Sequence, residues 1–167
     1  MRVGLLSRVK ILGYVTAMCL FLYFAILMLN NIFLWKGRDL DTMSCDAIIN
    51  IHKENRLLSI RLKYSFLGNE GTATLSGILK SDVELSNVSR HVFFKYKRVD
   101  NSFYLEDTHV NISLQDNAGS DGLLDMLPDF YTKKGARANF QVYKQTPGGY
   151  VFVKEFTPAF YCTEQRY

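Results

Sequence analysis

LSIRLKYSF, residues 58–66, carries the clearest secondary-structure signal in this chain. Apolar or aromatic side chains fill the even positions from Leu58 to Phe66, and the odd positions carry only Ser, Arg and Lys. Side chains two residues apart lie on the same face of a strand, so this alternation predicts one buried face and one solvated face. Half-buried strands of this kind are typical of antiparallel sheets.

The same alternation recurs on both sides of residues 58–66. Turn residues at 68–71, 100–102 and 147–149 separate the alternating segments. Further strands are expected at residues 46–52, 72–79, 92–97 and 103–114, from Ala138 to the turn at 147–149, and at 150–156. Pro158 then breaks the run before Phe160-Tyr161-Cys162. Seven or so antiparallel strands predict a mainly β domain, either a β-barrel or a β-sandwich, and the sequence leaves both open.

Two segments depart from regular alternation. In residues 103–114 the apolar positions are odd at Phe103 and Leu105 but even at Val110, Ile112 and Leu114, and a bulge near Asp107 would reconcile them.

Residues 120–128, SDGLLDMLP, predict one short helix that begins at Ser120 or Asp121 and ends at Pro128. Leu123, Leu124 and Leu127 would form its apolar face. This helix could close one end of the sheet or barrel.

Residues 11–35 form an uncharged and mostly apolar run. About 20 such residues cross the hydrocarbon core of a bilayer as a helix, so this run predicts a single transmembrane signal-anchor. A cleaved signal peptide is the alternative, but its apolar core is usually only about 7–15 residues long. A small-x-small cleavage site follows such a core, and residues 34–38 contain none. A lipoprotein reading of Cys45 is weaker, because Thr42-Met43-Ser44 is a poor match to a lipobox.

Charge gives the orientation and the domain plan. Arg2, Arg8 and Lys10 precede the run without any acidic residue, which predicts a cytoplasmic tail at residues 1–10. A linker at 36–44 and an exported β domain at 45–167 would follow the membrane helix at 11–35. Beyond the run, 17 Lys and Arg stand beside 16 Asp and Glu, and this near balance argues against direct binding of nucleic acid. The basic tail suits the bilayer's anionic headgroups.

The three cysteines fit the same plan. Cys19 lies within the apolar run, whereas Cys45 and Cys162 lie at opposite ends of the exported domain. Thiols in an oxidising compartment are expected to pair, so Cys45 and Cys162 predict a disulfide. The alternative is two free thiols that face apart.

The sequence offers no catalytic constellation, and we expect neither an enzyme nor a cofactor or metal site. His52, His91 and His109 are scattered along the chain. Acidic residues read as ordinary turn or solvated positions, namely Glu106, Asp107, Asp125 and Asp129. The many Phe and Tyr side chains are interpreted as core, and the alternative is a lining for an amphipathic ligand.

Several short motifs together resemble the FidL-like membrane proteins of enteric bacteria, over nearly the whole chain. They are Ser44-Cys45, Tyr64-Ser65-Phe66, Thr74-Leu75-Ser76-Gly77, Arg90 before Val92-Phe93-Phe94-Lys95-Tyr96, Leu127-Pro128-Asp129-Phe130 and Pro158-Ala159-Phe160-Tyr161-Cys162. The resemblance implies a single-pass protein of the bacterial inner membrane with a periplasmic β domain. It supplies no catalytic residue.

Members of that family look like small accessory partners of membrane-spanning transcription regulators, in the manner of the ToxR and ToxS pair. The resemblance therefore implies binding and stabilisation of such a regulator. Two alternatives stay open: a periplasmic sensor of an amphipathic molecule such as a bile acid or fatty acid, and an accessory in envelope or secretion assembly.

Overall fold

The computed structural model describes residues 14, 16–30, 40, 42–82 and 84–165 of the chain. It divides the chain into two compact units, Met1–Asp39 and Leu40–Tyr167. In the first unit, residues 14 and 16–30 are helical. No helix within the described residues is both long and apolar enough to meet the requirements for a membrane span. The expected tail, both ends of the apolar run and residues 36–39 and 41 of the expected linker lie outside the described residues.

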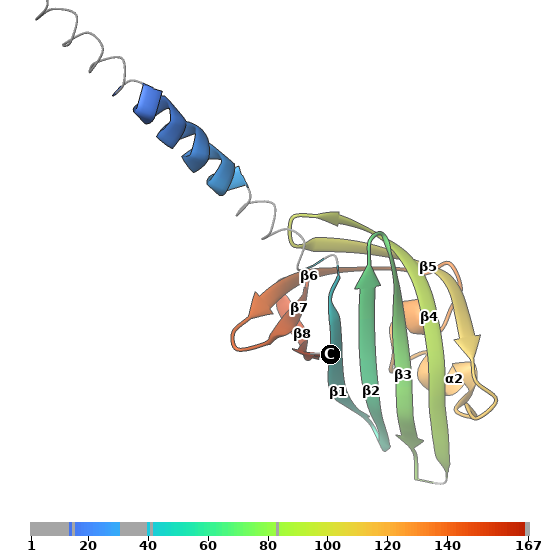
Figure 1. Cartoon of the computed structure of the whole chain (residues 1–167). Helices are drawn as coiled ribbons and strands as arrows, with labels where there is room; N and C mark the ends of the chain where they lie inside the picture. The colour runs from blue at the N-terminus through green and yellow to red at the C-terminus, as the bar shows by residue number, and fades with distance from the viewer. Residues whose placement is uncertain (1–13, 15, 31–39, 41, 83, 166–167) are drawn as a thin grey trace, which may run out of the picture. The chain divides into compact units, whose positions relative to one another are not determined.

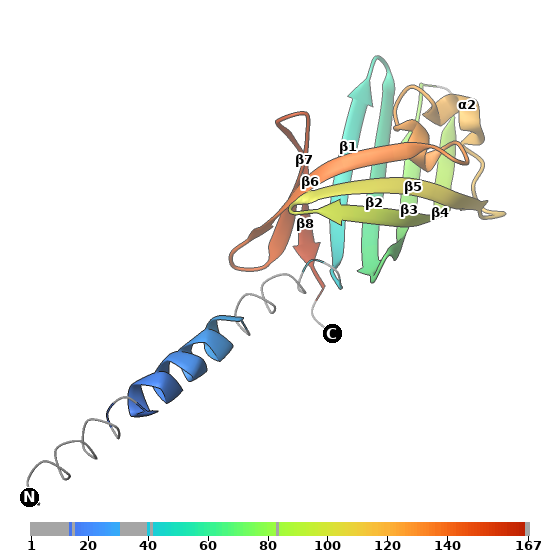
Figure 2. The same cartoon turned by 90° about the horizontal axis from the view of Figure 1, so that it is seen from above.

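The second unit is a closed antiparallel barrel in which each strand pairs with the next along the chain and the last pairs with the first (Figure 1, Figure 2). This result decides between the two expected architectures in favour of the barrel. Its strands are β1 Ser44–Lys53, β2 Arg56–Leu67, β3 Glu70–Lys80, β4 Leu85–Val99, β5 Ser102–Ile112, β6 Arg137–Gln145, β7 Gly149–Lys154 and β8 Thr157–Glu164.

The inward faces are the ones that the alternation predicts. On β2 the even positions from Leu58 to Phe66 are all buried, and on β3 Ala73, Leu75 and Leu79 are buried. One core forms from the inward side chains of all eight strands, with Leu40 and Met43 packed beside them. Burial of apolar surface at about 25 cal/mol per Å² is therefore the main force that closes the sheet on itself.

The predicted bulge in β5 is confirmed. The β4–β5 register shifts between Phe93 and Phe94, where His109 and then Asp107 are the partners, so Thr108 is the extra residue. The prediction for the end of this segment is wrong. The strand stops at Ile112, which is 46% exposed, and Leu114 beyond it is fully exposed, because β5 pairs with β6 only over Ser102–Glu106.

The last hairpin also differs from the expected single strand at 150–156. β7 ends at Lys154, and a two-residue turn of Glu155 and Phe156 leads into β8. Both turn residues have positive φ, 49° and 67°, as the tightest hairpin turns require. The expected break at Pro158 is wrong, because Pro158 lies inside β8, beside the register shift opposite Val153.

The helical segment is shorter than expected. The helix α2 spans Gly119–Leu123, and a 3₁₀ turn, η1, follows at Asp129–Tyr131 (Figure 2). Leu123 and Leu127 are buried as predicted, but Leu124 is 37% exposed, because the helix ends before Pro128 and the chain turns away. Side chains of residues 120 and 121 lie outside the described part, so the predicted cap is not tested. Met126, Phe130 and Tyr131 extend the core at this point.

Candidate functional site

The barrel closes through a short seam between its first and last strands. β1 and β8 share the pairs Cys45↔Glu164 and Asp46↔Thr163. The backbone N–H of Gln165 adds a hydrogen bond to the Ser44 carbonyl at 3.0 Å. By contrast, β1 and β2 are paired along their whole length, from Ser44↔Ser65 to Lys53↔Arg56. The seam is thus the weakest ladder that involves β1.

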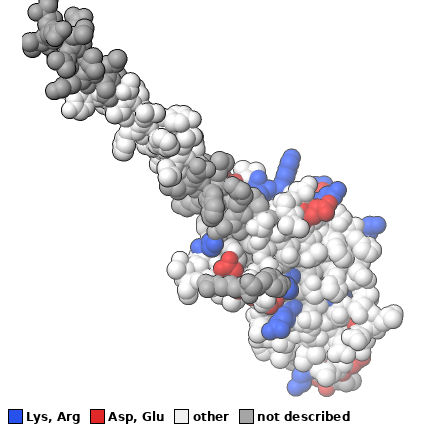
Figure 3. All heavy atoms as spheres, in the orientation of Figure 1, with Lys and Arg blue, Asp and Glu red and all other residues white. Residues whose placement is uncertain are grey.

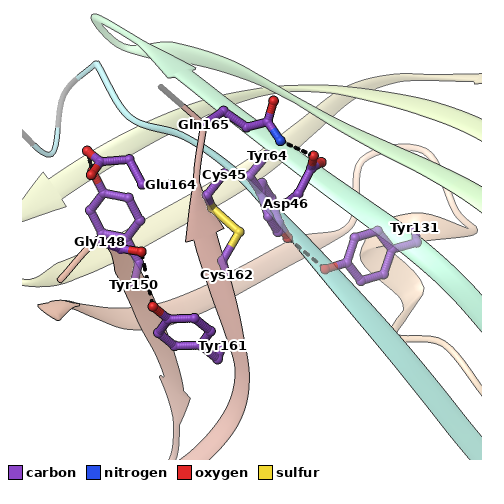
Figure 4. Close-up of a disulfide and its surroundings, with 10 residues drawn as sticks. All are labelled: Cys45, Asp46, Tyr64, Tyr131, Gly148, Tyr150, Tyr161, Cys162, Glu164 and Gln165. Atoms are coloured by element: carbon purple, nitrogen blue, oxygen red, sulfur yellow. Dashed lines mark hydrogen bonds between the residues drawn. A yellow bond between two sulfur atoms is a disulfide. The ribbon is translucent and has the colours of Figure 1, made fainter. Parts of the chain in front are cut away.

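The predicted disulfide lies across this seam and is confirmed. The Sγ atoms of Cys45 and Cys162 are bonded, the two Cα atoms are 5.4 Å apart, and both side chains are completely buried (Figure 4). The two residues are 117 positions apart in sequence. Their bond therefore joins the two ends of the barrel at the point where strand pairing is shortest.

Polar contacts surround the disulfide (Figure 4). The Gln165 side-chain amide donates to the Asp46 carboxylate, and the Tyr150 hydroxyl donates to Glu164 at 3.0 Å. The Tyr161 hydroxyl donates to the Gly148 carbonyl at 3.1 Å, which ties β8 to the turn before β7. The second carboxylate oxygen of Asp46, Oδ1, is buried and has no hydrogen-bond partner among the described residues.

Beyond the disulfide, β1 and β8 separate and leave a groove of about 700 Å³. β1 contributes one wall and β8 the other. The lining residues are Asp46, Ala47, Ile48, Ile49, Asn50, Arg61, Ala159, Phe160, Tyr161, Thr163 and Gln165. Ile48 is 73% exposed and Tyr161 48% exposed, so the groove presents apolar side chains to solvent. Arg61 is exposed beside Ile48 and has no ion pair with any described residue.

A stack of aromatic rings joins the groove to the barrel interior. Phe160 lines the groove, and its ring centroid lies 4.6 Å from that of Phe152 and 6.2 Å from that of Tyr64. Deeper inside, the hydroxyls of Tyr64 and Tyr131 are 2.6 Å apart. Burial raises the pKa of Tyr131 to about 12 and raises the pKa of Tyr64 well above its usual value, so both side chains are neutral hydrogen-bonding groups.

Two buried charges were not identified by the sequence analysis. Asp107, expected to be solvated, is 3% exposed and accepts a hydrogen bond from the Gly135 N–H at 3.2 Å. Arg90, 1% exposed, forms an ion pair with Asp116 at 3.0 Å. A signal was available for both, because Asp107 continues the odd, inward positions of Phe103 and Leu105, and Arg90 shares the even, inward parity of its strand.

The three histidines are on different strands. His52 is on β1, His91 on β4 contacts the Thr74 hydroxyl at 3.2 Å, and His109 on β5 stacks on Phe93. Among the described residues, no group of three His, Cys, Asp or Glu side chains is placed to hold a metal ion. On the face seen in Figure 3, basic and acidic side chains are interspersed over the barrel.

A family model described as the YqeJ C-terminal domain matches residues 42–162, which covers more than half of the chain. The chain therefore belongs to that family. The match begins two residues after the start of the compact unit at Leu40 and ends at Cys162, so it contains both halves of the disulfide. No curated protein and no solved structure matches the chain.

Proposed function

We propose that this member of the YqeJ C-terminal domain family is a single-pass accessory protein of the bacterial inner membrane. In this proposal the barrel lies in the periplasm, where it binds and stabilises a membrane-spanning transcription regulator. The apolar run at residues 11–35 serves as the anchor, and the basic tail at residues 1–10 stays in the cytoplasm. The resemblance of the sequence to FidL-like proteins supports this assignment, and the YqeJ match itself does not bear on it.

The observation that carries the proposal is the disulfide at the barrel seam. Disulfides form and persist in oxidising compartments such as the periplasm. Cys45 begins the barrel immediately after the expected linker, so the bond supports export of everything that follows the apolar run. The short β1–β8 pairing at this bond also leaves the strand edges beyond it available.

Stabilisation of a regulator follows from mass action. A protein that binds only the folded form of its partner lowers the unfolded and protease-sensitive fraction. Two proteins anchored in one bilayer also meet at a raised effective concentration. The accessory protein therefore needs a docking surface and no catalytic residue.

Deletion of the gene tests this function. We expect the half-life of one membrane-spanning regulator, measured by pulse-chase, to fall without a change in its transcript, and the full chain supplied in trans to restore it. The Cys45→Ala/Cys162→Ala chain should restore it poorly, whereas a Cys19→Ala chain should restore it fully. Unchanged levels and output of every such regulator in the deletion strain would refute the proposal.

A second function, sensing of an amphipathic ligand, is favoured by one observation. Phe160 is half-buried at the groove and stacks on Phe152 inside the barrel, so an apolar molecule entering the groove would meet aromatic rings. Calorimetric titration of the full chain with a bile acid and with a fatty acid tests it. Binding that is lost in Phe160→Ala but kept in Phe93→Ala, on the outer face of β4, would support sensing.

A further inference from the structure

The groove between β1 and β8 is bordered by two strand edges. After Asp46↔Thr163, no described residue of β8 pairs with β1. Residues 47–53 of β1 are paired with β2, and residues 157, 158 and 160–162 of β8 are paired with β7. Each strand therefore has one satisfied edge and one edge that faces the groove. Exposed edges of this kind are the positions at which another strand can be added.

Backbone direction identifies which groups face the groove. Along a strand in an antiparallel ladder, the N–H and C=O groups of successive residues point to opposite sides. The Met43 carbonyl accepts from the Phe66 N–H at 2.8 Å, toward β2, and the Ser44 carbonyl accepts from the Gln165 N–H at 3.0 Å, toward β8. The backbone N–H and C=O groups of the even-numbered residues of β1 thus point away from β2. Ile48 and Asn50 consequently direct their backbone donors and acceptors into the groove.

We propose that this groove binds a single extended segment of the partner regulator, which adds to the barrel as a strand on the β1 edge. This inference rests on the proposed function. The bound segment pairs its backbone with Ile48 and Asn50. It places apolar side chains against Ile48 and Tyr161 and an acidic side chain beside Arg61.

The walls of the groove determine the kind of occupant. Because strand edges lie on both sides, the groove suits a segment that has no sheet partner of its own. A strand that is paired on both sides within another barrel does not meet this requirement. This condition excludes β2 to β7 of a second copy of this chain, because each of them has a paired neighbour on both sides. Charge complementarity adds the acidic requirement, because Arg61 is exposed at the groove without an ion pair to any described residue. The disulfide holds the groove closed at one end.

A proline at position 48 separates backbone pairing from side-chain contact. Ile48→Pro removes the N–H that faces the groove. The hydrogen bonds between β1 and β2 keep all their donors, because this N–H is not one of them, and Pro is tolerated where the N–H faces away from the sheet. Ile48→Ala removes more of the apolar side chain than Ile48→Pro does, but it keeps the N–H. In cells of the deletion strain, we expect Ile48→Ala to restore the half-life of the regulator in part, because only side-chain contact is lost, and Ile48→Pro to leave it as in the deletion.

The outcomes of this experiment separate the two proposals. If the deletion changes no regulator, the proposed function fails and the docking site fails with it. If the deletion shortens the half-life and Ile48→Pro restores it as well as the wild-type chain, the function stands and the groove is not the docking site. Partial restoration by Ile48→Ala with none by Ile48→Pro supports both, and equal failure of the two variants would refute backbone pairing at Ile48.

A synthetic peptide tests the groove directly and does not depend on folding of the proline variant. The probe is a ten-residue peptide of alternating Val and Thr with one central Glu, and its control carries Lys in place of Glu. With benzoylphenylalanine in place of Ile48 in the purified full chain, we expect a photoadduct with the Glu peptide and a yield lower by about tenfold with the Lys peptide. The same label in place of the exposed Ile78 on β3 should give none. Equal yields at the two positions, equal yields with the two peptides, or an adduct only with a second copy of the chain would overturn the proposal.

Discussion

Arg90 and Asp116 form an ion pair that is almost completely enclosed by the protein. The Arg90 Nε atom lies 3.0 Å from Asp116 Oδ2, and the two side chains are 1% and 2% exposed. Asp116 also accepts from the Ser89 N–H at 2.9 Å, and Arg90 donates to the Gly119 carbonyl at 3.3 Å. The pair therefore fixes the connection between β5 and α2 onto β4.

Removing one member of this pair should destabilise the barrel strongly. Asp116→Ala leaves a buried guanidinium without its counter-charge, and we expect the free energy of unfolding to fall by about 3–5 kcal/mol. The control is Arg137→Ala, which breaks the exposed pair with Glu106 and should cost less than about 1 kcal/mol. Urea unfolding of both variants, followed by circular dichroism, measures the difference. Similar losses in the two variants would contradict the prediction.

The disulfide should contribute more than any single noncovalent contact at the seam. Cys45→Ala/Cys162→Ala removes a link between residues 117 positions apart, for which the chain-entropy model gives about 4–5 kcal/mol as an upper figure. We expect urea unfolding of the double variant to match that of the reduced wild-type chain. Cys19→Ala, which changes the free cysteine, is the control and should leave the midpoint unchanged. A reductant that shifts the double variant as much as the wild-type chain would refute this interpretation.

The features of the fold that depend only on neighbouring residues could be predicted from the sequence. Period-two alternation identified the inward faces of β2 and β3, and the change of parity in 103–114 identified the bulge, because side-chain direction in a strand depends only on position. The disulfide was predicted from the expected oxidising compartment and from the number of cysteines in the exported part.

Features that depend on distant segments could not be predicted in the same way. Closure of a barrel depends on twist and stagger accumulated over all strands, so the short pairing of β1 with β8 has no local signature. The groove at that seam results from the way the barrel closes, so it could not be predicted from the sequence either. Arg90 and Asp116 are an intermediate case: the even parity of β4 was a local signal for burial of Arg90 that the sequence analysis did not use, whereas its partner lies 26 residues away on a connecting loop.

Asp107 should make stability depend on pH. Burial raises the pKa of its carboxyl, so the folded chain prefers the protonated form. Stability from this group is fully present below the unfolded pKa of about 3.9 and is lost as the pH rises through the higher folded pKa. We expect Asp107→Asn to flatten the fall in stability above about pH 4, measured by urea unfolding across a pH series. Glu106→Gln, at the exposed neighbouring position, should keep the wild-type slope, and an unchanged slope in Asp107→Asn would contradict this assignment.

Asp125 should show the opposite dependence. Hydrogen bonds from Arg56 and Lys53 lower the pKa of its carboxyl to about 2. Stability from this exposed pairing is present above the unfolded pKa of about 3.9 and is lost as the pH falls toward 2. Asp125→Asn should therefore reduce the loss of stability in acid, at lower pH than the effect of Asp107. The same pH series checks it, with Asp129→Asn as the control.

Gly77 should not tolerate a side chain. A Cβ atom at this inward position of β3 would overlap the Ser59 carbonyl oxygen and lie 2.8 Å from the Ile60 Cα, and backbone atoms of a paired strand have little room to move. We expect Gly77→Ala to cost about 1–3 kcal/mol of unfolding free energy, the usual range for overpacking. Gly122→Ala in α2 is the matched control, because its Cβ would meet only Leu79 Cδ2, at 3.4 Å. A Gly77→Ala chain as stable as the control would show that β2 and β3 can separate locally.

The hydroxyl pair of Tyr64 and Tyr131 should behave as a unit. The oxygens are 2.6 Å apart in the core, and each is the other's hydrogen-bond partner among the described residues. Tyr131→Phe leaves the Tyr64 hydroxyl buried without a partner, which should cost about 1–3 kcal/mol. Tyr64→Phe should cost a similar amount for the same reason. The double variant removes both polar groups, so we expect it to be less destabilised than the sum of the single variants, and a double-mutant cycle from urea unfolding measures the coupling. Strict additivity would mean that the two hydroxyls are not energetically coupled, and it would contradict this prediction.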